Sequence, residues 1–518
     1  MHGRLKVKTT EEQEKARQLE QDKKVKAYQT ATSRIFAKRV AGELDIEALQ
    51  LSGAVLAKNP DVYSLWNYRK EIYLHLIKSL PETRICELFD EELSFLVSCL
   101  TYNPKSYGSW EHRCFVLLHH PKADWERELT LCNKFLTYDE RNFHCWDYRR
   151  FVIKHSKVTA EEELNFTFEK IASNFSNYSS WHYRSKLLPQ IHGSCSGHSS
   201  GLTQSILHQE MELVQNAFFT DPNDQSAWFY HRWLLGRVER PMKLLDVNSD
   251  GARVVLTFSV PVKVLDNESV SWTAPSDQGY SCVWFCSNHT SNQSVRALYN
   301  GEEKEFDTFH AETATGLKDA YFRRDVTAAT TDVLDKELES CQELFELEPE
   351  NKWVLLTIVL LMNSLDPDKY EDEITHNLQK LMLVDSYRAN YYRDLQSRFI
   401  WEKTLMGASP SIELDLSHRH LTSLYHQNLL YTVVKLDLSN NKLTSLQGIN
   451  YLQRLQSLNL SNNRICSSRG LRNMSNLVYL NISNNMLTDR EAVDETIATC
   501  RGLTEIQLDG NPWTLTDG

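Results

Sequence analysis

Lys105 is the residue of this chain best placed to compensate the charge of an anionic ligand. It stands two residues before Tyr107, near the predicted start of a helix, where free backbone N–H groups and the helix dipole already favour an anion. The corresponding position, five residues before the tryptophan of each other repeat described below, holds Asp61, Arg141, Ser176 and Asn223. Lysine is therefore no requirement of the repeat, and anion stabilisation is the chemistry that it suggests. A solvated surface lysine is the alternative.

The sequence offers no comparable pattern for a metal site. It contains no Cys-x-x-Cys or His-x-x-x-His pair, so no complete zinc site is visible. Cys282 and Cys286, four residues apart, are poor evidence for a metal by themselves. His2 could reach the metal of a partner, although a disordered tail is the more ordinary interpretation. The glycine- and serine-rich residues 192–201 are predicted to form a loop between helical hairpins, not a phosphate-binding loop.

The elements that must position Lys105 are helical repeats over residues 44–240. Each repeat carries a tryptophan followed three or four residues later by an arginine. These pairs are Trp66 and Arg69, Trp110 and Arg113, Trp146 and Arg149, Trp181 and Arg184, and Trp228 and Arg232. Successive tryptophans are 44, 36, 35 and 47 residues apart, and a period in this range indicates stacked helical hairpins. We expect the tryptophans to pack the layers between hairpins and to do no chemistry.

Within a hairpin, the first helix shows an apolar stripe and the second begins after an Asn-Pro or similar pair. Leu93, Leu96, Val97 and Leu100 recur at helical spacing. The Asn-Pro pair at 103–104 then ends that helix and caps the next one. Since the arginine follows its tryptophan by about one turn, both lie on one face, and we expect the arginine to reach a neighbouring carboxylate or carbonyl. Upstream, residues 11–26 mix charges at helical spacing and predict a solvated helix.

The helical pattern is interrupted by a β-rich segment over about 241–321. Runs rich in β-branched and aromatic residues occur at 253–260, 270–272, 282–285 and 295–299, with polar turn clusters between them. Their spacing predicts a small immunoglobulin-like β sandwich without a disulfide. Helical pattern resumes with the stripe that starts at Leu334, and Trp353 opens another apolar helix. We interpret this as one degenerate sixth hairpin, which makes the β segment an insertion into the helical domain.

The last hundred or so residues are predicted to be leucine-rich repeats. The pattern Leu-x-Leu-x-x-Asn-x-Leu recurs with its asparagines at 441, 463, 485 and 511, and Arg419 takes the asparagine position in the first repeat. Each repeat places a short strand on one face, and the asparagine satisfies backbone groups at the turn. The atypical first and last repeats fit the ends of such a stack.

Composition narrows the possible functions. The net charge of −12 argues against general nucleic-acid binding, which requires a basic surplus. The best apolar run, residues 354–362, is about half the roughly 18 residues that a membrane span requires, and the N-terminus has no signal-peptide core. We therefore expect a cytoplasmic protein with no membrane span and with its 11 cysteines reduced.

The repeated Asn/Asp-Pro-x-x-Tyr-x-x-Trp-x-x-Arg units resemble those of protein prenyltransferase α subunits. The β insertion and the C-terminal leucine-rich repeats further resemble the Rab geranylgeranyltransferase branch of that family in animals. The smaller α subunit shared by the CAAX-type enzymes has the helical repeats only. The resemblance covers essentially the whole chain, and it is least specific in the β segment.

This resemblance implies a catalytic role shared with a partner chain. A separate β subunit would hold a zinc ion and the isoprenoid pocket, and the zinc would lower the pKa of the acceptor cysteine. The thiolate would attack C1 of geranylgeranyl diphosphate, and the departing diphosphate would need positive charge, part of which this chain would supply. The implied partners are the β subunit, Rab GTPases, a Rab escort protein and geranylgeranyl diphosphate.

The resemblance also assigns site residues. Lys105 matches the family lysine that reaches the diphosphate, with Tyr107 beside it, and Asn142 and His144 match positions that line the same site. Phe143 stands where the family often has tyrosine, which removes one hydroxyl. For Asn142 and His144, helix capping or hydrogen bonding between helices is the alternative role.

The predicted architecture is multidomain and mainly α, an α–α superhelix of hairpin repeats with an inserted immunoglobulin-like β sandwich and C-terminal leucine-rich repeats. The expected boundaries are 1–240 for the charged helix and five hairpins, 241–325 for the β sandwich, 326–405 for the final hairpin and 406–518 for the leucine-rich repeats. A non-catalytic scaffold of interaction modules is the alternative function, since fold alone never establishes catalysis. Lys105 in its Pro-Lys-x-Tyr context, together with Asn142 and His144, distinguishes the two.

Overall fold

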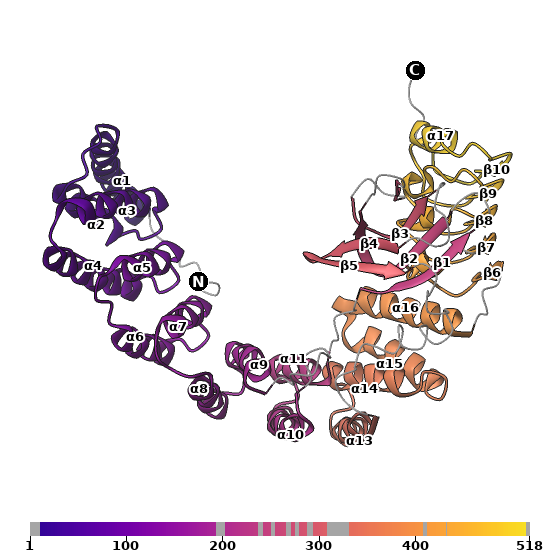
Figure 1. The fold of residues 1–518 in the computed structure, drawn as a ribbon, viewed down its shortest axis with the longest axis horizontal. Coiled ribbons are helices and arrows are strands. Elements are labelled where there is room, and N and C mark those ends of the chain that lie inside the picture. The colour runs from indigo at the N-terminus through magenta and orange to yellow at the C-terminus, as the bar shows by residue number, and fades with distance from the viewer. Residues whose placement is uncertain are drawn as a thin grey trace. The chain divides into compact units, whose positions relative to one another are not determined.

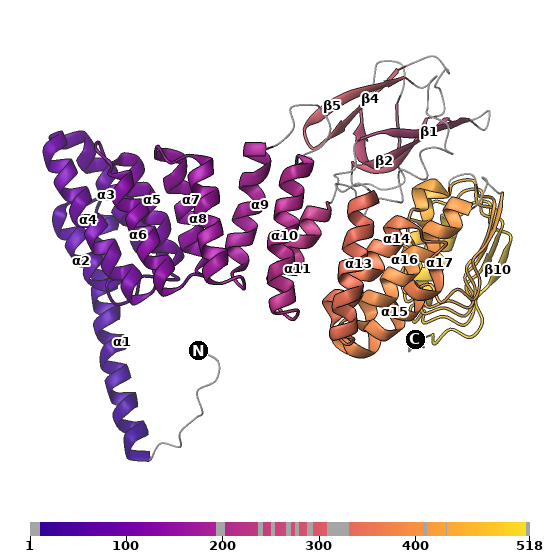
Figure 2. The same cartoon turned by 90° about the horizontal axis from the view of Figure 1, so that it is seen from below.

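The structure is a computed structural model that describes residues 11–192, 202–236, 242–249, 254–265, 271–274, 279–286, 294–307, 331–407, 412–430 and 433–513. The chain divides into two compact units, residues 1–191 and 192–518. This division falls inside the helical repeats and not at any predicted domain boundary. Figures 1 and 2 show the helices and strands of the two units. His2 lies outside the described residues, as do most of the loop residues 192–201.

The first unit is a stack of antiparallel helices that follows the predicted repeats. Its helices are α1 (Glu11–Val40), α2 (Ile46–Leu56), α3 (Tyr63–Ser79), α4 (Glu82–Tyr102), α5 (Tyr107–His119), α6 (Trp125–Tyr138), α7 (Phe143–His155), α8 (Ala160–Ser173) and α9 (Tyr178–His192). The pairs α2–α3, α4–α5, α6–α7 and α8–α9 form the hairpins (Figure 2). Most described side chains of α1 are exposed, in agreement with a solvated helix.

The tryptophans of the repeats are buried, and each one also locks the loop in front of its helix. The indole N–H donates to the backbone carbonyl six residues earlier in the chain. In chain order, these bonds join Trp66 to Pro60 (2.7 Å), Trp110 to Pro104 (2.9 Å), Trp146 to Glu140 (2.8 Å), Trp181 to Phe175 (2.7 Å) and Trp228 to Pro222 (2.9 Å). Each tryptophan thus packs in the core, and its buried indole N–H has the hydrogen-bond partner that a buried donor needs.

The arginines of the first three repeats reach carboxylates of the next first helix, and Arg184 reaches Leu164 O of its own hairpin at 3.1 Å. Both contacts agree with the expected carboxylate or carbonyl partner. Arg113 Nε donates to Glu128 Oε2 at 2.7 Å, and Arg149 Nε donates to Glu163 Oε2 at 2.8 Å. In the first repeat, Arg69 makes the same bidentate contact with Glu92. Burial alone would raise the pKa of Glu92, but Arg69 and His112 outweigh it and hold that pKa at about 2. These ion pairs fix the spacing between successive hairpins.

The helices of the second unit are α10 (Gln204–Thr220), α11 (Gln225–Leu235), α13 (Thr331–Leu347), α14 (Lys352–Leu365), α15 (Glu371–Val384) and α16 (Ala389–Gly407). Contacts across the β insertion join the helices on either side of it. His231 Nε2 lies 2.7 Å from Glu337 Oε2, and Asn351 Nδ2 donates to Pro222 O at 2.9 Å. The two flanks of the insertion therefore belong to one helical stack.

The expectation of one degenerate sixth hairpin was incomplete, because two hairpins follow the insertion. The pairs are α13–α14 and α15–α16. The second pair was missed because its helices meet without the Trp–Arg signal. Trp401 of α16 is fully buried, but its indole N–H donates to Ser423 O in the leucine-rich repeats at 3.0 Å.

The insertion contains the antiparallel strands β1 (Leu244–Ser249), β2 (Val254–Val264), β3 (Ser281–Cys286), β4 (Ser294–Tyr299) and β5 (Glu302–Asp307). β1 and β3 pair with the first half of β2, whereas β4 pairs with its end and continues to β5. The described strands thus form one connected sheet of five, and the immunoglobulin-like sandwich stays a prediction. Neither β1 nor β5 was predicted, although the Asn300-Gly301 turn, with both φ values positive, is a strong hairpin signal.

The leucine-rich repeats carry the short parallel strands β6 (Glu413–Asp415), β7 (Lys435–Asp437), β8 (Ser457–Asn459), β9 (Tyr479–Asn481) and β10 (Glu505–Gln507). The repeat asparagines act as predicted. Asn463 Nδ2, for example, donates to Leu438 O and Leu460 O, and its Oδ1 accepts from Leu443 N. The longer step of the last repeat accommodates α17 (Arg490–Ala498). Across the described part of the chain, no helix combines the length and apolar content that a bilayer crossing requires.

Candidate functional site

Lys105 lies in the loop between α4 and α5, with its side chain directed to solvent. Its ammonium-bearing side chain is 68% exposed, and Nζ is 3.9 Å from Asp139 Oδ2 in the equivalent loop of the next repeat. Its backbone N–H donates to Asn103 Oδ1 at 3.1 Å, which closes a turn around the lysine. An exposed ion pair of this kind contributes at most about 1 kcal/mol, so Lys105 can exchange Asp139 for a stronger anion.

The loop around Lys105 is anchored through the carbonyl of Pro104, the residue directly before the lysine. Pro104 O accepts from the indole of Trp110 at 2.9 Å and from Asn142 Nδ2 at 2.9 Å. Ser106, directly after the lysine, is the N-cap of α5 and donates its hydroxyl to Pro60 O at 3.1 Å. Lys105 therefore carries an exposed side chain on a loop whose backbone is held by hydrogen bonds.

Asn142 is buried beneath this loop. Its Oδ1 caps α7 by accepting from the backbone N–H groups of His144 (3.1 Å) and Cys145 (3.4 Å), while Nδ2 makes the bond to Pro104. Asn177 makes the corresponding bond to Glu140 O, at 3.0 Å, one repeat later. The polar atoms of Asn142 are thus engaged with backbone, and the geometry favours positioning over contact with a ligand.

Tyr107 and His144 form a direct pair at the starts of α5 and α7. Their ring centroids are 4.2 Å apart and their planes meet at 86°, an edge-to-face contact. His144 retains only 6% of its surface, whereas Tyr107 is well exposed. The phenol is therefore available to a ligand, and the largely buried imidazole packs against it.

The electrostatics of this pair link it to Lys105. Burial lowers the pKa of His144, and the charge of Lys105 lowers it further, against the opposing influence of Asp147. His144 is therefore neutral near pH 7 and can donate one N–H without carrying a charge. Lys105, Tyr107 and His144 form one cluster at the starts of α5 and α7. The cluster combines a cation, a phenol and a neutral imidazole. Such a cluster can bind an oxyanion and stabilise charge that develops on it.

Sequence reasoning missed Asp139 as the neighbour of Lys105. Its Oδ1 closes a turn by accepting from Arg141 N at 3.1 Å, as Asn103 and Asn174 do in their own loops. Asparagine at the equivalent positions shows that the turn needs no charge. The negative charge of Asp139 is therefore not needed for the turn. A comparison of this position between repeats could have identified it from the sequence.

A row of aromatic side chains accompanies the cluster along the first unit. The first residue of each second helix is aromatic and between 51% and 58% exposed, namely Tyr63, Tyr107, Phe143 and Tyr178. Because they occupy the same position in successive hairpins, they mark one side of the stack. Exposed aromatic side chains at regular spacing are typical of a protein-binding surface.

Comparison with protein families matches the repeats that carry the cluster. Five stretches match the protein prenyltransferase alpha subunit repeat, at residues 46–76, 89–120, 125–156, 160–191 and 207–238. Lys105 and Tyr107 fall in the second stretch, and Asn142 and His144 in the third. Residues 432–473 match a pair of leucine-rich repeats.

Similar proteins extend this match over most of the chain. The geranylgeranyl transferase type-2 subunit alpha of Sus scrofa is 45% identical over 466 residues, which cover 84% of this chain and 82% of the pig protein. The protein of the same name from Homo sapiens is 44% identical with the same coverage. A solved structure, Candida albicans protein geranylgeranyltransferase-I complexed with GGPP, aligns with 72% of this chain and 91% of its own at a TM-score of 0.44 and 16% identity. Nothing about the function of this chain is inferred from a structural similarity this distant.

Proposed function

The chain belongs to the geranylgeranyl transferase type-2 α-subunit family, and we propose that it transfers geranylgeranyl to C-terminal cysteines of Rab GTPases as one half of a heterodimer. Geranylgeranyl diphosphate is the donor. The observation that carries the role of this chain is the exposed ammonium of Lys105 beside the neutral His144 and the phenol of Tyr107.

In the proposed reaction, the acceptor thiolate attacks C1 of the donor, the C1–O bond breaks and the diphosphate leaves with the bonding electron pair. Lys105 leaves Asp139 and pairs with the diphosphate, whose negative charge grows as the bond breaks. Tyr107 and His144 donate hydrogen bonds to the same group. Asn142 keeps the loop of Lys105 in place through Pro104 and acts as a positioning residue.

Zinc, when bound, would supply the acidification of the acceptor thiol, and we assign it to the β subunit. Within the described residues, no group of three His, Cys, Asp or Glu side chains is arranged to hold a metal ion. Those residues therefore do not fit a zinc site. The role that we propose for this chain is to bind and orient the diphosphate.

The partners follow from the same proposal. We infer that the aromatic row of Tyr63, Tyr107, Phe143 and Tyr178 contacts the β subunit, because the cluster can reach a donor held there only from this side of the stack. A Rab escort protein would present the Rab GTPase, and the reaction would take place in the cytosol. The immunoglobulin-like assignment of β1–β5 remains part of this proposal, and it rests on the spacing of the β-rich runs in the sequence.

The test is geranylgeranyl transfer to a Rab GTPase with escort protein, by the β-paired wild type and the Lys105→Ala variant. We expect kcat to fall roughly 10²-fold, about 3 kcal/mol, as for loss of one transition-state charge contact. Lys122→Ala is the matched control, since Lys122 is also an exposed loop lysine with a distant carboxylate partner, Glu82 at 3.8 Å. Full activity of Lys105→Ala would remove this residue from the chemistry. No transfer by a stably paired wild type would favour the scaffold function.

A further inference from the structure

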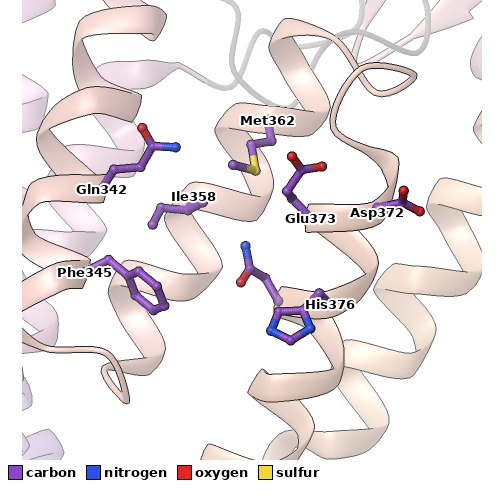
Figure 3. A pocket seen from close by; sticks show the side chains of 8 residues that line it. Gln342, Phe345, Ile358, Met362, Asp372, Glu373 and His376 are labelled. Atoms are coloured by element: carbon purple, nitrogen blue, oxygen red, sulfur yellow. The ribbon is translucent and has the colours of Figure 1, made fainter.

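An open cavity of about 410 Å³ lies between α13, α14 and α15 in the second unit. Phe345 of α13 and Ile358 and Met362 of α14 form its apolar floor, while Glu373 and His376 of α15 line the opposite wall (Figure 3). Figure 3 shows the carboxylate of Glu373 directed toward Met362. A cavity of this size accommodates one or two large apolar side chains of a partner.

The helices around this cavity carry most of the net charge of the chain. Residues 331–384 contain 13 Asp or Glu and 4 Lys or Arg, which leaves −9 of the total of −12. Glu337 is buried and bonded to His231 and Gln215, but most of the other acidic side chains are exposed. At the cavity itself, neither Asp372 nor Glu373 has an ion-pair partner among the described residues. The rim thus attracts positive charge and repels anionic ligands.

The aromatic part of the floor already accepts a cation from within the chain. Lys380 Nζ of α15 lies 4.6 Å from the centroid of the Phe345 ring, within the range of a cation–π contact. The face of Phe345 is therefore already paired with a cation of this chain. The attraction for the cations of a partner comes from the acidic rim, beside an apolar floor.

The wall formed by α15 continues as an exposed surface that ends in two apolar side chains. His376, Lys380 and Leu383 follow one another at helical spacing and lie on one face of α15. Leu383 is 82% exposed, and Tyr387, directly beyond the helix, is fully exposed. Exposed apolar side chains beside a pocket offer contacts to the apolar face of an amphipathic segment.

We propose that the α13–α15 groove, defined by Phe345, Ile358, Met362, Glu373 and Leu383, docks a lysine- or arginine-rich amphipathic segment of a partner protein. The apolar side chains of the segment enter the cavity and cover Leu383, and its cations pair with Asp372 and Glu373. This inference goes beyond the proposed function and does not depend on it, because neither the diphosphate nor the residues around Lys105 take part.

The test uses the full-length chain and a fluorescent helical peptide of about four turns with leucines at i, i+3, i+4 and i+7 and lysines elsewhere. Fluorescence anisotropy should show saturable binding that weakens with salt. The Asp372→Lys, Glu373→Lys double variant should bind roughly tenfold or more weakly. The Glu126→Lys, Glu161→Lys variant is the control, since it reverses two acidic residues in the first turns of α6 and α8 and should bind as the wild type does.

Two further comparisons separate docking from general attraction between opposite charges. Leu383→Ser, at a side chain too exposed to affect folding, should weaken binding about threefold and keeps the test decisive if the charge reversal perturbs α15. A peptide in which serines replace the leucines should bind at least about tenfold more weakly. Unchanged binding by both protein variants, equal binding of the serine peptide, or no binding by the wild type would each overturn the proposal.

Discussion

Asn142 Nδ2 donates a hydrogen bond of 2.9 Å to the carbonyl of Pro104, the residue directly before Lys105. Through this bond, the capping residue of α7 also fixes the loop that carries the candidate diphosphate ligand of the previous repeat. The positions of Lys105 and His144 are therefore coupled through backbone, although each belongs to a different hairpin. Five predictions follow from this arrangement and from the ion pairs around it.

Replacing Asn142 by alanine should lower both stability and activity. The variant loses a helix cap and leaves Pro104 O with one donor fewer, which together cost about 1–3 kcal/mol. Thermal denaturation and kcat/KM of the β-paired enzyme would measure the two effects. Asn142→Ser should restore much of both, because Ser106 makes the equivalent bond to Pro60. Asn177→Ala, which removes the same bond one repeat later, should lower stability alone; equal losses of activity in the two alanine variants would argue against a positioning role.

Replacing Asp139 by asparagine should tighten binding of the donor. The variant removes the negative charge 3.9 Å from Lys105 Nζ but keeps the turn, which Asn103 and Asn174 form elsewhere. We expect the KM for geranylgeranyl diphosphate to fall by about two- to fivefold, in line with an exposed ion pair of up to about 1 kcal/mol. Asp221→Asn, at the same position of a later loop, is the control and should leave KM unchanged. A higher KM in Asp139→Asn would mean that Asp139 aids binding.

The titration of His144 should report the charge of Lys105. Burial and Lys105 both lower the pKa of His144, so NMR of ¹³C-labelled histidine should place its midpoint below the usual value of about 6.5. In Lys105→Ala the midpoint should rise, and in Lys122→Ala it should stay in place. An unchanged midpoint in Lys105→Ala would mean that the charge of Lys105 does not act on His144.

The same shift predicts the sign of a stability effect. Because the pKa of His144 is lower in the folded chain, the unfolded chain takes up the proton first as the pH falls. His144 therefore leaves stability unaffected above about pH 6.5 and lowers it progressively below that value. Denaturation midpoints measured from pH 7.5 to 5 should fall less steeply in His144→Gln than in the wild type. An identical slope would contradict a depressed pKa.

Breaking the buried pair between Arg113 and Glu128 should be among the most damaging single changes. Arg113→Ala leaves the Glu128 carboxylate buried with Tyr148 as its remaining partner, which costs about 3–5 kcal/mol. Circular dichroism during thermal unfolding measures the loss. The double variant Arg113→Met, Glu128→Leu should recover most of it, since no charge is then left unpaired. Arg490→Ala, in the exposed pair with Asp494, should cost less than about 1 kcal/mol, and a similar loss at both sites would refute the argument from burial.

Several parts of this protein could be predicted because the chain repeats them. Trp66, Trp146 and their counterparts recur with the same neighbours, since every hairpin needs the same buried indole and the same bond to a loop carbonyl. The asparagines of the leucine-rich repeats recur for the same reason. Lys105 could be singled out because the equivalent positions of the other repeats hold different residues, so the fold itself does not require a lysine there. The Asn300-Gly301 turn was equally local, and the hairpin of β4 and β5 could have been predicted from it.

The sequence by itself thus determined the repeats, the interruption by β strands and the identity of the candidate site residues. Only the tertiary structure decided that Asn142 is buried against Pro104, that Tyr107 meets His144 edge-to-face and that His231 reaches Glu337 across the insertion. It also decided that α15 and α16 add a further hairpin. The physical reason is the range of the interactions. Caps, stripes and turns are specified by residues a few positions apart, whereas contacts between distant residues depend on how whole helices pack, which leaves no regular spacing in the sequence.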